Sequence, residues 1–320
     1  MRADAQAQPN IALVKYWGKR DPVRNLPAVG SLSVTLDALW TRMSVELDTR
    51  RREDSLSVNG STGDSMLPRV SDCLDRLLGA ARPKAAIVSE SNFPVAAGLA
   101  SSASAFAALV VAASEAASLS RDRLTLARCA GAASGSAARS LFDGIVELSA
   151  CDDEIDVRSI AAVDDWPLQV VIAINDEQPK AVGSGIAMLR SAATSPFYAS
   201  WIERQAGDLD AARRAVAERD FAALAAVAEH SCLKMHSLMW TSRPPVVYWN
   251  KATLACMETV RALQQDGYPV FFTIDAGPQV KAVCLPGASE AVSAVLSATD
   301  GVRTVVTSGL GAGARILDAA

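Results

Sequence analysis

A run of small residues between a strand and a helix constrains the fold of this chain more than any other feature. Residues 85–91 are expected to form a strand, and the alanine-rich segment 100–118, free of glycine and proline, predicts a helix. The segment between them reads Phe93-Pro-Val-Ala-Ala-Gly-Leu-Ala-Ser-Ser-Ala-Ser104. Gly98 permits a tight turn, and the helix start directs unpaired N–H groups and a positive dipole end at the loop. The segment therefore predicts a cradle for a phosphate group.

The same segment is also compatible with an ordinary capped helix that follows a proline turn. No GxxxxGK[ST] sequence occurs in the chain, and the segment lacks the spacing of a dinucleotide-binding fingerprint. The hydroxyls of Ser101, Ser102 and Ser104 add donors for phosphate oxygens and a candidate Mg²⁺ ligand. The choice between a cradle and a plain helix start therefore depends on the residues that accompany the segment.

Two further stretches supply the charges that a phosphorylated substrate needs. Asn10-Ile-Ala-Leu-Val-Lys-Tyr-Trp-Gly-Lys-Arg20 carries two lysines four positions apart beside aromatic residues. Thr273-Ile-Asp-Ala-Gly-Pro278 places an acid at the end of an apolar strand. Fixed positive charge, a phosphate cradle and a buried carboxylate together predict phosphoryl transfer, which none of the three predicts alone.

The composition is that of a protein with a large hydrophobic core. Half of the 320 residues are hydrophobic and 21% are charged, so extensive disorder is not expected. The net charge of −4 argues against a general nucleic-acid binder but permits a local basic pocket. The amino-terminal residues lack the apolar core of a signal peptide, and no apolar run reaches membrane-spanning length. We therefore expect a cytoplasmic protein without nucleic-acid or membrane partners.

The cysteines and histidines do not indicate a metal site or a hydrolase. Six cysteines are scattered without a CxxC pair, which favours reduced, buried thiols. The two histidines, His230 and His236, do not share one helical face as a metal pair. A Ser-His-Asp hydrolase and a histidine-rich zinc site are therefore poorly supported.

Strands and helices follow one another without a regular βαβ alternation, which predicts an α+β fold rather than a doubly wound sheet. The turn at Asp164-Asp-Trp-Pro167 predicts a boundary near residue 165 and hence domains 1–165 and 166–320. In the first domain the pattern predicts strands over 10–17, 31–36, 42–47, 56–58, 85–91 and 141–148, a hairpin turn at Asn59-Gly60, and helices over 66–80, 100–118 and 121–134. In the second it predicts helices over 183–192, 197–217, 219–239, 249–266 and 288–298, and strands over 168–174, 269–275, 279–285 and 302–307.

Five motifs resemble those of the diphosphomevalonate decarboxylase family, which belongs to the superfamily of galactokinase, homoserine kinase, mevalonate kinase and phosphomevalonate kinase. They occur in family order and span about residues 10–310. The motifs are Asn10-Ile-Ala-Leu-Val-Lys-Tyr-Trp-Gly-Lys-Arg-Asp21, Ser31-Leu-Ser-Val-Thr-Leu36, Asn92-Phe-Pro-Val-Ala-Ala-Gly-Leu-Ala-Ser-Ser102, Ser134-Gly-Ser-Ala-Ala-Arg-Ser-Leu-Phe142 and Ile274-Asp-Ala-Gly-Pro278. Five ordered motifs are far more specific than the serine-rich loop, which the whole superfamily shares.

The resemblance implies a two-domain small-molecule kinase fold, with an amino-terminal half like domain 2 of ribosomal protein S5 and a ferredoxin-like carboxyl-terminal half. It implies an active site in the cleft between the halves, and a homodimer. It also implies ATP and Mg²⁺ as cofactors and a phosphorylated mevalonate as the substrate. In the implied reaction, ATP phosphorylates the tertiary 3-hydroxyl of mevalonate 5-diphosphate, and phosphate and CO₂ then leave to give isopentenyl diphosphate.

By resemblance, Asp275, Lys15 and Arg139 are the catalytic residues. Asp275 orients or accepts the proton of the 3-hydroxyl, Lys15 keeps that acid ionised, and Arg139 grips the substrate carboxylate. The implied substrate-binding residues are Tyr16, Lys19, Ser134, Gly135, Ser136, Arg139 and Ser184. The residues implied at the ATP phosphates are Pro94, Ala97, Gly98, Leu99, Ala100, Ser101, Ser102 and Ser104, with Ser102 as the Mg²⁺ ligand. Without the resemblance, Asp275 also fits a turn-capping aspartate, and Arg139 fits a surface ion pair.

Several residues depart from the family pattern, and Gly185 bears on the choice of substrate. It lies in Val182-Gly-Ser-Gly-Ile-Ala-Met188, where other members carry Ser-Arg or Ser-Thr at the substrate diphosphate. Losing one charge-assisted contact weakens binding of the second phosphate by roughly 1.5–3 kcal/mol. The same chemistry on mevalonate 5-phosphate is therefore an alternative, as is a kinase that stops after phosphorylation. An RNA-binding protein with an S5-like domain is a more distant alternative, which the acidic balance disfavours.

Overall fold

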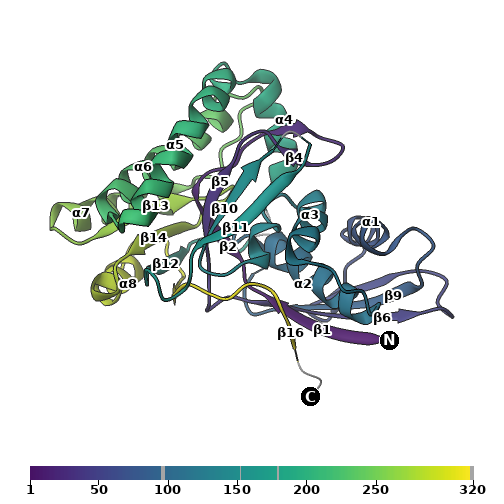
Figure 1. Cartoon of the computed structure of the whole chain (residues 1–320). Helices are drawn as coiled ribbons and strands as arrows, with labels where there is room; N and C mark the ends of the chain where they lie inside the picture. The colour runs from purple at the N-terminus through teal and green to yellow at the C-terminus, as the bar shows by residue number, and fades with distance from the viewer. Residues whose placement is uncertain (95–97, 152, 179, 318–320) are drawn as a thin grey trace.

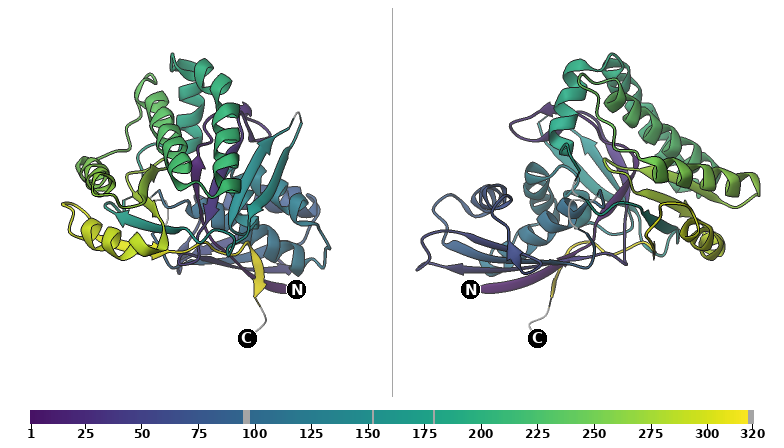
Figure 2. Two further views of the ribbon diagram at one scale, coloured as in Figure 1. Left: turned by 60° about the vertical axis from the view of Figure 1, so that its left-hand side comes forward. Right: turned by 180° about the vertical axis from the view of Figure 1, so that it is seen from behind.

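The computed structural model describes residues 1–94, 98–151, 153–178 and 180–317. These residues form sheets of six, four and four strands, a two-stranded ribbon and eight α-helices. Strands and helices are mixed along the chain, and the predicted α+β fold is confirmed. In Figure 1 and Figure 2 the six-stranded sheet lies at one side of the molecule, and the long helices of the carboxyl-terminal half lie at the other.

The first sheet packs against three helices of the amino-terminal half. Its strand order is β16-β1-β6-β9-β7-β8, and alternate residues of β6 are buried, as expected for a sheet with one covered face. The strands are β1 (Arg2–Ala7), β6 (Thr41–Asp48), β7 (Ser55–Val58), β8 (Ser61–Thr62), β9 (Lys84–Ser91) and β16 (Arg315–Leu317). The helices are α1 (Leu67–Leu78), α2 (Ser101–Ala116) and α3 (Arg123–Ala133). Because α2 is rich in alanine, neighbouring elements can approach it closely along most of its length.

The second sheet contains the start of the lysine-bearing stretch, residues 10–20. Its order is β11-β10-β5-β2, and every residue of β2 and β5 is buried, so this sheet lies inside the molecule. Its strands are β2 (Asn10–Val14), β5 (Ser31–Thr35), β10 (Ile145–Ala150) and β11 (Ile155–Ala161). A ribbon of β3 (Lys19–Asp21) and β4 (Leu26–Pro27) follows β2.

The carboxyl-terminal half is an antiparallel sheet with helices packed on it. The strand order is β13-β14-β12-β15. The strands are β12 (Gln169–Ile174), β13 (Val270–Ile274), β14 (Val280–Cys284) and β15 (Thr304–Ser308), and the helices are α4 (Ser184–Thr194), α5 (Tyr198–Glu218), α6 (Phe221–Trp240), α7 (Lys251–Gln265) and α8 (Ser289–Ser297). One hydrophobic cluster contains Ile11 and Leu13 together with Val170 and Phe271. The two halves therefore share a continuous core where they meet.

The last strand of the described chain returns to the sheet of the first half. β16 pairs antiparallel with β1, with Asp4 opposite Leu317, and in Figure 1 the two strands lie side by side. This strand therefore does not belong with the unit expected over 166–320. The sequence pattern predicts neither β1 nor β16, because β16 has only three residues and the hydrophobic residues that β1 buries are alanines, which do not favour a strand.

Most other expectations are confirmed with small shifts at the ends. Asn59 and Gly60 have positive φ and form the turn of the β7–β8 hairpin. The strand expected over 141–148 begins only at Ile145, because Arg139–Leu141 forms a 3₁₀ turn instead. That turn directs Arg139 into the interior, where its side chain is buried. Within the described ranges, no helix combines the length and the apolar character that crossing a bilayer requires.

Candidate active site

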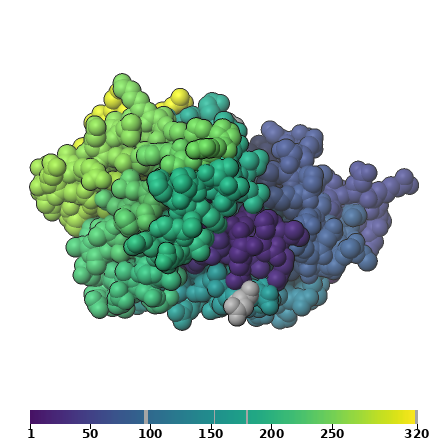
Figure 3. All heavy atoms as spheres, turned by 90° about the horizontal axis from the view of Figure 1, so that it is seen from above, coloured from purple at the N-terminus to yellow at the C-terminus, as the bar shows by residue number. Residues whose placement is uncertain are grey.

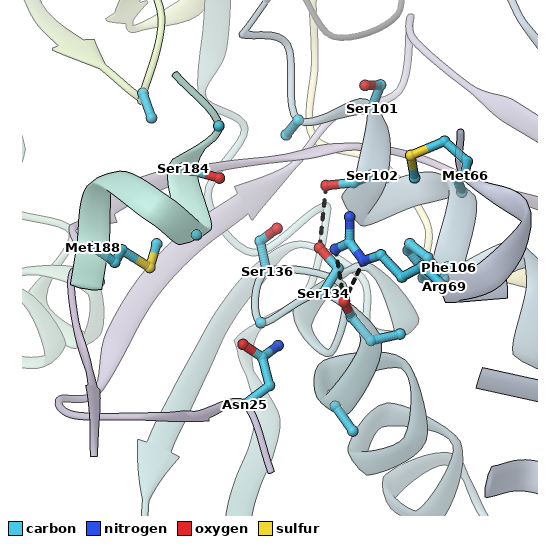
Figure 4. Close-up of a pocket in the computed structure, with 18 of the residues that line it drawn as sticks. Asn25, Met66, Arg69, Ser101, Ser102, Phe106, Ser134, Ser136, Ser184 and Met188 are labelled. Atoms are coloured by element: carbon cyan, nitrogen blue, oxygen red, sulfur yellow. Dashed lines mark hydrogen bonds between the residues drawn. The ribbon is translucent and has the colours of Figure 1, made fainter. Parts of the chain in front are cut away.

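A pocket of about 730 Å³ lies between the two halves and is lined by residues of both. Figure 3 shows the amino-terminal segment, in purple, between the helices of the carboxyl-terminal half and the rest of the amino-terminal half. In the close-up of Figure 4, Ser184 on α4 and Ser102 on α2 lie on opposite walls. Lys15 and Asp275 also line the pocket, so all three candidate stretches meet there.

Asp275 follows β13 at a point that α6 holds in place. The backbone N–H of Ile274 donates to the Cys232 sulfur at 3.2 Å, and Nε2 of His236 lies 3.2 Å from the Ile274 carbonyl oxygen. Cys232 and His236 are four residues apart on α6, so both face the end of the strand. Burial lowers the pKa of His236 to about 3, which keeps its ring neutral. Neutral groups therefore fix the backbone that presents Asp275.

Lys15 contacts Asp275 from the other half of the molecule. Its ammonium donates to Asp275 Oδ1 at 2.6 Å and to the Ala12 carbonyl at 2.7 Å. The Lys15 side chain is only 1% exposed, so the two charges interact where water screens them poorly. The backbone N–H of Lys15 donates to the Ser231 hydroxyl on α6 at 2.9 Å, which ties the segment to the same helix that supports Asp275.

A second ammonium flanks the same carboxylate. Lys281, on β14, is fully buried and its Nζ lies 3.6 Å from Asp275 Oδ2. Burial acts to raise the pKa of Asp275, but the charges of Lys15, Lys281 and Arg139 outweigh burial and leave that pKa below its ordinary value. Asp275 is therefore ionised at neutral pH. Its Oδ2 atom is buried and accepts no hydrogen bond from the described part of the chain.

Arg139 lines the pocket with most of its guanidinium held by polar side chains. It donates to the Asn10 side-chain oxygen from Nε at 3.2 Å and from Nη2 at 3.0 Å. It also donates to the hydroxyls of Ser33 at 2.9 Å and Ser31 at 2.6 Å. Burial lowers the pKa of Arg139 to about 10, so the group remains charged at neutral pH. Arg139 is thus a fixed cation rather than a member of a surface ion pair.

The turn that begins at Ser134 packs closely against Ser102 on α2 and Tyr16 after β2. Ser134 Oγ lies 3.1 Å from Ser102 Oγ, an interaction drawn as a dashed line in Figure 4. A Cβ atom on Gly135 would lie 2.7 Å from the Tyr16 hydroxyl, so only glycine lets the turn come this close. Burial raises the pKa of Tyr16 to about 12, and its hydroxyl therefore stays protonated and can donate.

The structure brings all of the expected substrate-binding residues into the pocket lining. They are Tyr16, Lys19, Ser134, Gly135, Ser136, Arg139 and Ser184. Lys19 faces the start of α4, where a Cβ atom on Gly185 would lie 3.8 Å from Lys19 Nζ. Burial lowers the pKa of Lys19, and the charge of Arg69 lowers it further. Gly185 therefore leaves open space beside an ammonium group.

The loop before α2 brings backbone as well as hydroxyl groups to the pocket. Gly98 has a φ of +84°, and a Cβ atom there would lie 3.0 Å from Gly277 Cα. Ala100 has a φ of 56°, a left-handed conformation that is uncommon outside glycine, immediately before α2 begins. Gly98, Ala100, Ser101 and Ser102 all line the pocket. The amino-terminal end of α2, with its unpaired N–H groups, therefore faces the cavity.

Four of the residues expected at the ATP phosphates are not among the described residues that line the pocket. Ser104 does not line the pocket, because its side chain is fully buried and its hydroxyl lies 2.7 Å from the Thr41 hydroxyl. Two residues beyond Ser102 on a helix, its side chain points away from the face that Ser102 presents. Leu99 packs its side chain in the hydrophobic cluster between the halves, and Pro94, although described, does not line the pocket. Ala97 lies outside the described residues.

Sequence reasoning misses several charged residues of the site. Lys180 donates to the Ala276 carbonyl at 3.0 Å, next to the candidate acid. Arg69 enters the pocket from α1, as Figure 4 shows. Lys281 interrupts the otherwise apolar strand β14, and a lone lysine in such a strand is the signal that could have identified it. For Lys180 and Arg69 the sequence offers no comparable signal.

The pocket holds an excess of positive charge around one ionised carboxylate. The cations in its lining are Lys15, Lys19, Arg69, Arg76, Arg139 and Lys180, and the anions are Asp72 and Asp275. This balance favours a ligand that carries several negative charges. A substrate hydroxyl placed at Asp275 would lie beside ammonium groups that can offset the charge of a transferred phosphoryl group.

Two family models together match most of the chain. Residues 7–161 match the diphosphomevalonate decarboxylase-like N-terminal domain. Residues 170–310 match the mevalonate 5-diphosphate decarboxylase C-terminal domain. The two matches correspond to the two halves described above, and the second ends before the strand that returns to the first sheet.

Curated relatives and solved structures resemble the chain over nearly its whole length. The diphosphomevalonate decarboxylase of Candida albicans is 36% identical over 297 residues, which cover 86% of this chain and 82% of the relative. The diphosphomevalonate decarboxylase of Saccharomyces cerevisiae is 35% identical, over 86% of this chain and 76% of the relative. Mevalonate diphosphate decarboxylase from Staphylococcus aureus superposes with a TM-score of 0.92 at 31% identity, over 99% and 98% of the two chains. A structure of MDDEF in complex with MVAPP, AMPPCP and magnesium superposes with a TM-score of 0.92 at 33% identity. The match covers 100% of this chain and 99% of that chain.

Proposed function

The chain belongs to the diphosphomevalonate decarboxylase family, and on that basis we propose that it converts mevalonate 5-diphosphate and ATP into isopentenyl diphosphate, ADP, phosphate and CO₂. The observation that carries this proposal is the ionised carboxylate of Asp275, held by Lys15 at 2.6 Å, in a pocket that also contains Arg139. An acid, an ammonium and a guanidinium are the groups that a 3-hydroxy carboxylic acid requires at its reacting end.

Asp275 orients the 3-hydroxyl through its free oxygen. Lys15 occupies Oδ1, while Oδ2 is buried without a hydrogen bond from the described residues. A hydroxyl that donates to Oδ2 is thereby aimed with its oxygen at an incoming phosphoryl group. A carboxylate is far too weak a base to remove the proton of a tertiary alcohol in advance, so the proton moves late, as the new O–P bond forms. Positioning is therefore the main contribution of Asp275.

Lys15 supports this step in two ways. Its positive charge keeps the pKa of Asp275 low, despite the burial that acts to raise it. The same charge offsets the negative charge that spreads over the transferred group. Because Ala12 and Ser231 fix the segment around Lys15, the ammonium needs no reorganisation during the reaction.

Arg139 is suited to hold the substrate carboxylate. Of its five N–H groups, the contacts within the described residues occupy the one on Nε, one on Nη1 and one on Nη2. One N–H on each terminal nitrogen remains, and this pair matches the two oxygens of a carboxylate. The fork holds the carboxylate in place while the adjacent C–O bond to phosphate breaks and CO₂ departs.

The start of α2 is the proposed site for the ATP phosphates. Backbone N–H groups at its amino-terminal end and the hydroxyls of Ser101 and Ser102 face the pocket. Ser102 is a hard oxygen donor within that lining, which suits Mg²⁺, and it is the residue that we propose as the metal ligand. The ion supplies neutralisation of phosphate charge, and the phosphate oxygens provide most of its ligands. Lys19 and Ser184 on the facing wall are the proposed contacts of the substrate phosphates.

We also propose that the enzyme is a cytoplasmic homodimer. All six cysteines are free thiols in the structure, which suits a reducing compartment. The dimer follows from family membership, and size-exclusion chromatography with light scattering measures it directly.

One assay tests the proposed function. The purified protein is incubated with Mg-ATP and either mevalonate 5-diphosphate or mevalonate 5-phosphate, and ADP and CO₂ are measured separately. Equal amounts of ADP and CO₂ with the diphosphate support the proposal. ADP without CO₂ would indicate a kinase that stops after phosphorylation, and turnover only with the monophosphate would identify a different substrate. No ADP with either compound would contradict the enzymatic assignment.

A further inference from the structure

Lys281 is a charged residue in the interior of a strand. It lies on β14, whose five residues are all buried, and its own side chain has 0% exposure. Moving an ammonium group from water into a protein interior is costly unless charged or polar partners surround it. The identity of those partners therefore indicates why a lysine occupies this position.

The ammonium of Lys281 joins two elements of the pocket from different halves of the chain. It donates to the Gly98 carbonyl at 3.0 Å and lies 3.6 Å from Asp275 Oδ2. Burial lowers the pKa of Lys281 to about 8, and the nearby charge of Asp275 acts to raise it. Lys281 is therefore mostly charged at neutral pH, in contact with both the loop before α2 and the candidate acid.

The hydrogen bond to Gly98 also orients the backbone that follows. The C=O and N–H of a trans peptide point in opposite directions, so a fixed Gly98 carbonyl fixes the direction of the Leu99 N–H. Gly98 has positive φ, and Ala100 is in the left-handed region, a combination that surrounding contacts must maintain. The hydrogen bond from Lys281 is such a contact, immediately before the amino-terminal end of α2.

We propose that Lys281 is a positioning residue for phosphoryl transfer, whose ammonium orients the loop at Gly98 and the carboxylate of Asp275 together. This role rests on the proposed function. The 3.6 Å separation from Oδ2 is longer than a hydrogen bond, so Lys281 attracts this oxygen without occupying its lone pairs. Lys15 holds Oδ1, so the carboxylate has a cation beside each oxygen, and Oδ2 remains available to the substrate hydroxyl.

Loss of the Lys281 charge should move the ionisation of Asp275 to higher pH. Activity that needs the carboxylate is present above the pKa of Asp275 and is lost below it. Removing one of the cations that lower this pKa raises it, so the acid limb of kcat/KM should move to higher pH. The titratable and charged groups that face Asp275 are Lys15 after β2, Arg139 in the 3₁₀ turn, Lys180 after β12, Cys232 and His236 on α6, and Lys281 on β14.

Two variants test this role. Lys281→Met keeps the length of the side chain and removes its charge. We expect kcat to fall about tenfold or more, the KM for Mg-ATP to rise, and the acid limb to shift upward. Lys281→Arg keeps the charge but enlarges the head group, so the acid limb should stay in place while affinity for a non-hydrolysable ATP analogue falls. A purely structural role would lower the melting temperature without moving the pH profile.

Lys234→Met is the matched control, because Lys234 forms an ion pair with Asp208 outside the pocket. It should leave both kcat and the pH profile unchanged. A folded Lys281→Met variant with kcat within twofold of wild type and an unshifted acid limb would overturn the proposal. If that variant does not fold, Lys281→Arg decides: a displaced acid limb or an unchanged analogue affinity would overturn the proposal as well. Absence of ADP formation by the wild type would instead refute the proposed function.

Discussion

The ammonium of Lys15 lies 2.6 Å from Asp275 Oδ1, although 260 positions separate the two residues in the chain. The contact crosses the junction between the halves, so the site exists only once both halves have folded and packed. Removing one member of a buried pair leaves the other as an uncompensated charge. The ionisation of the acid is therefore coupled to the assembly of the fold.

Asp275→Asn should abolish turnover while leaving nucleotide binding nearly intact. An amide keeps the shape of the side chain but has no charge with which to orient the hydroxyl and cannot accept its proton, so kcat should fall by about 10²–10⁴-fold. ADP release measures turnover, and titration with a non-hydrolysable ATP analogue measures affinity. Asp208→Asn is the matched control: Asp208 also pairs with a lysine and is 18% exposed, against 21% for Asp275, but it lies outside the pocket. Near-normal kcat in Asp275→Asn would refute the role of this acid.

Arg139→Lys should separate substrate binding from nucleotide binding. Lysine keeps a positive charge but loses the paired N–H groups that match a carboxylate, so the KM for the mevalonate substrate should rise roughly 10–100-fold. Affinity for the ATP analogue should change little. Because Asn10, Ser31 and Ser33 lose partners, the melting temperature should also be measured. A KM within twofold of wild type in a folded variant would show that Arg139 does not contact the substrate.

Gly98→Ala should weaken ATP binding through backbone strain. Gly98 has a φ of +84°, and the new Cβ atom would lie 3.0 Å from Gly277 Cα, so the loop must move. A strained backbone of this kind costs about 1–3 kcal/mol. Gly207→Ala on α5 is the control, since no atom lies within 4 Å of its Cβ position, and it should stabilise the protein by roughly 0.5–1 kcal/mol. Unchanged affinity for the ATP analogue in Gly98→Ala would exclude a strict need for this loop conformation.

The ion pair of Asp54 and Arg82 should govern part of the acid stability. Arg82 donates to both carboxylate oxygens, at 2.8 and 2.5 Å, and both side chains are almost fully buried. Burial acts to raise the pKa of Asp54, but the hydrogen bonds from Arg82 and the Ala85 N–H outweigh it and hold that pKa far below its usual range. The stabilisation is therefore complete above the unfolded-state pKa near 3.9 and is lost as pH falls through the folded-state value.

Asp54→Asn should accordingly lower the free energy of unfolding at pH 7 by roughly 1.5–3 kcal/mol, because the charge-assisted hydrogen bonds are lost while Arg82 keeps its ion pair with Asp75. The loss should shrink below pH 4, where the wild type begins to lose the same contribution. Urea unfolding at pH 7 and pH 3 measures both effects. Asp48→Asn, which breaks the exposed pair with Arg50, should change stability little at either pH. Equal losses in the two variants would contradict this account.

The long helices of the carboxyl-terminal half are the elements that the sequence predicts best. α5 spans Tyr198–Glu218 against an expected 197–217, because a sustained period of 3.6 residues records which face is buried. β1 and β16 show no comparable hydrophobic period in the sequence. Each pairs with the opposite end of the chain, so its stability depends on a contact that local sequence cannot encode.

In the site, individual stretches indicate chemistry but not which residues meet. The Lys15–Asp275 contact was implied by the family resemblance, since spacing carries no information across 260 positions. The apolar neighbours of Lys281 mark it as unusual in the sequence, but only the structure shows its partner, the Gly98 carbonyl. The serine-rich run does not show which hydroxyls face the pocket: helical rotation turns Ser104 toward Thr41, whereas Ser102 lines the cavity.

The return of the chain to its first sheet restricts how the molecule can move. The segment after β15 runs along β5, where the Gly311 N–H donates to the Thr35 carbonyl at 2.7 Å, and then reaches the edge of β1. The polypeptide thus passes between the halves at two places, before β12 and after β15. The halves are thus joined by two chain crossings as well as by the shared hydrophobic cluster, so they cannot separate without breaking the pairing of β16 with β1.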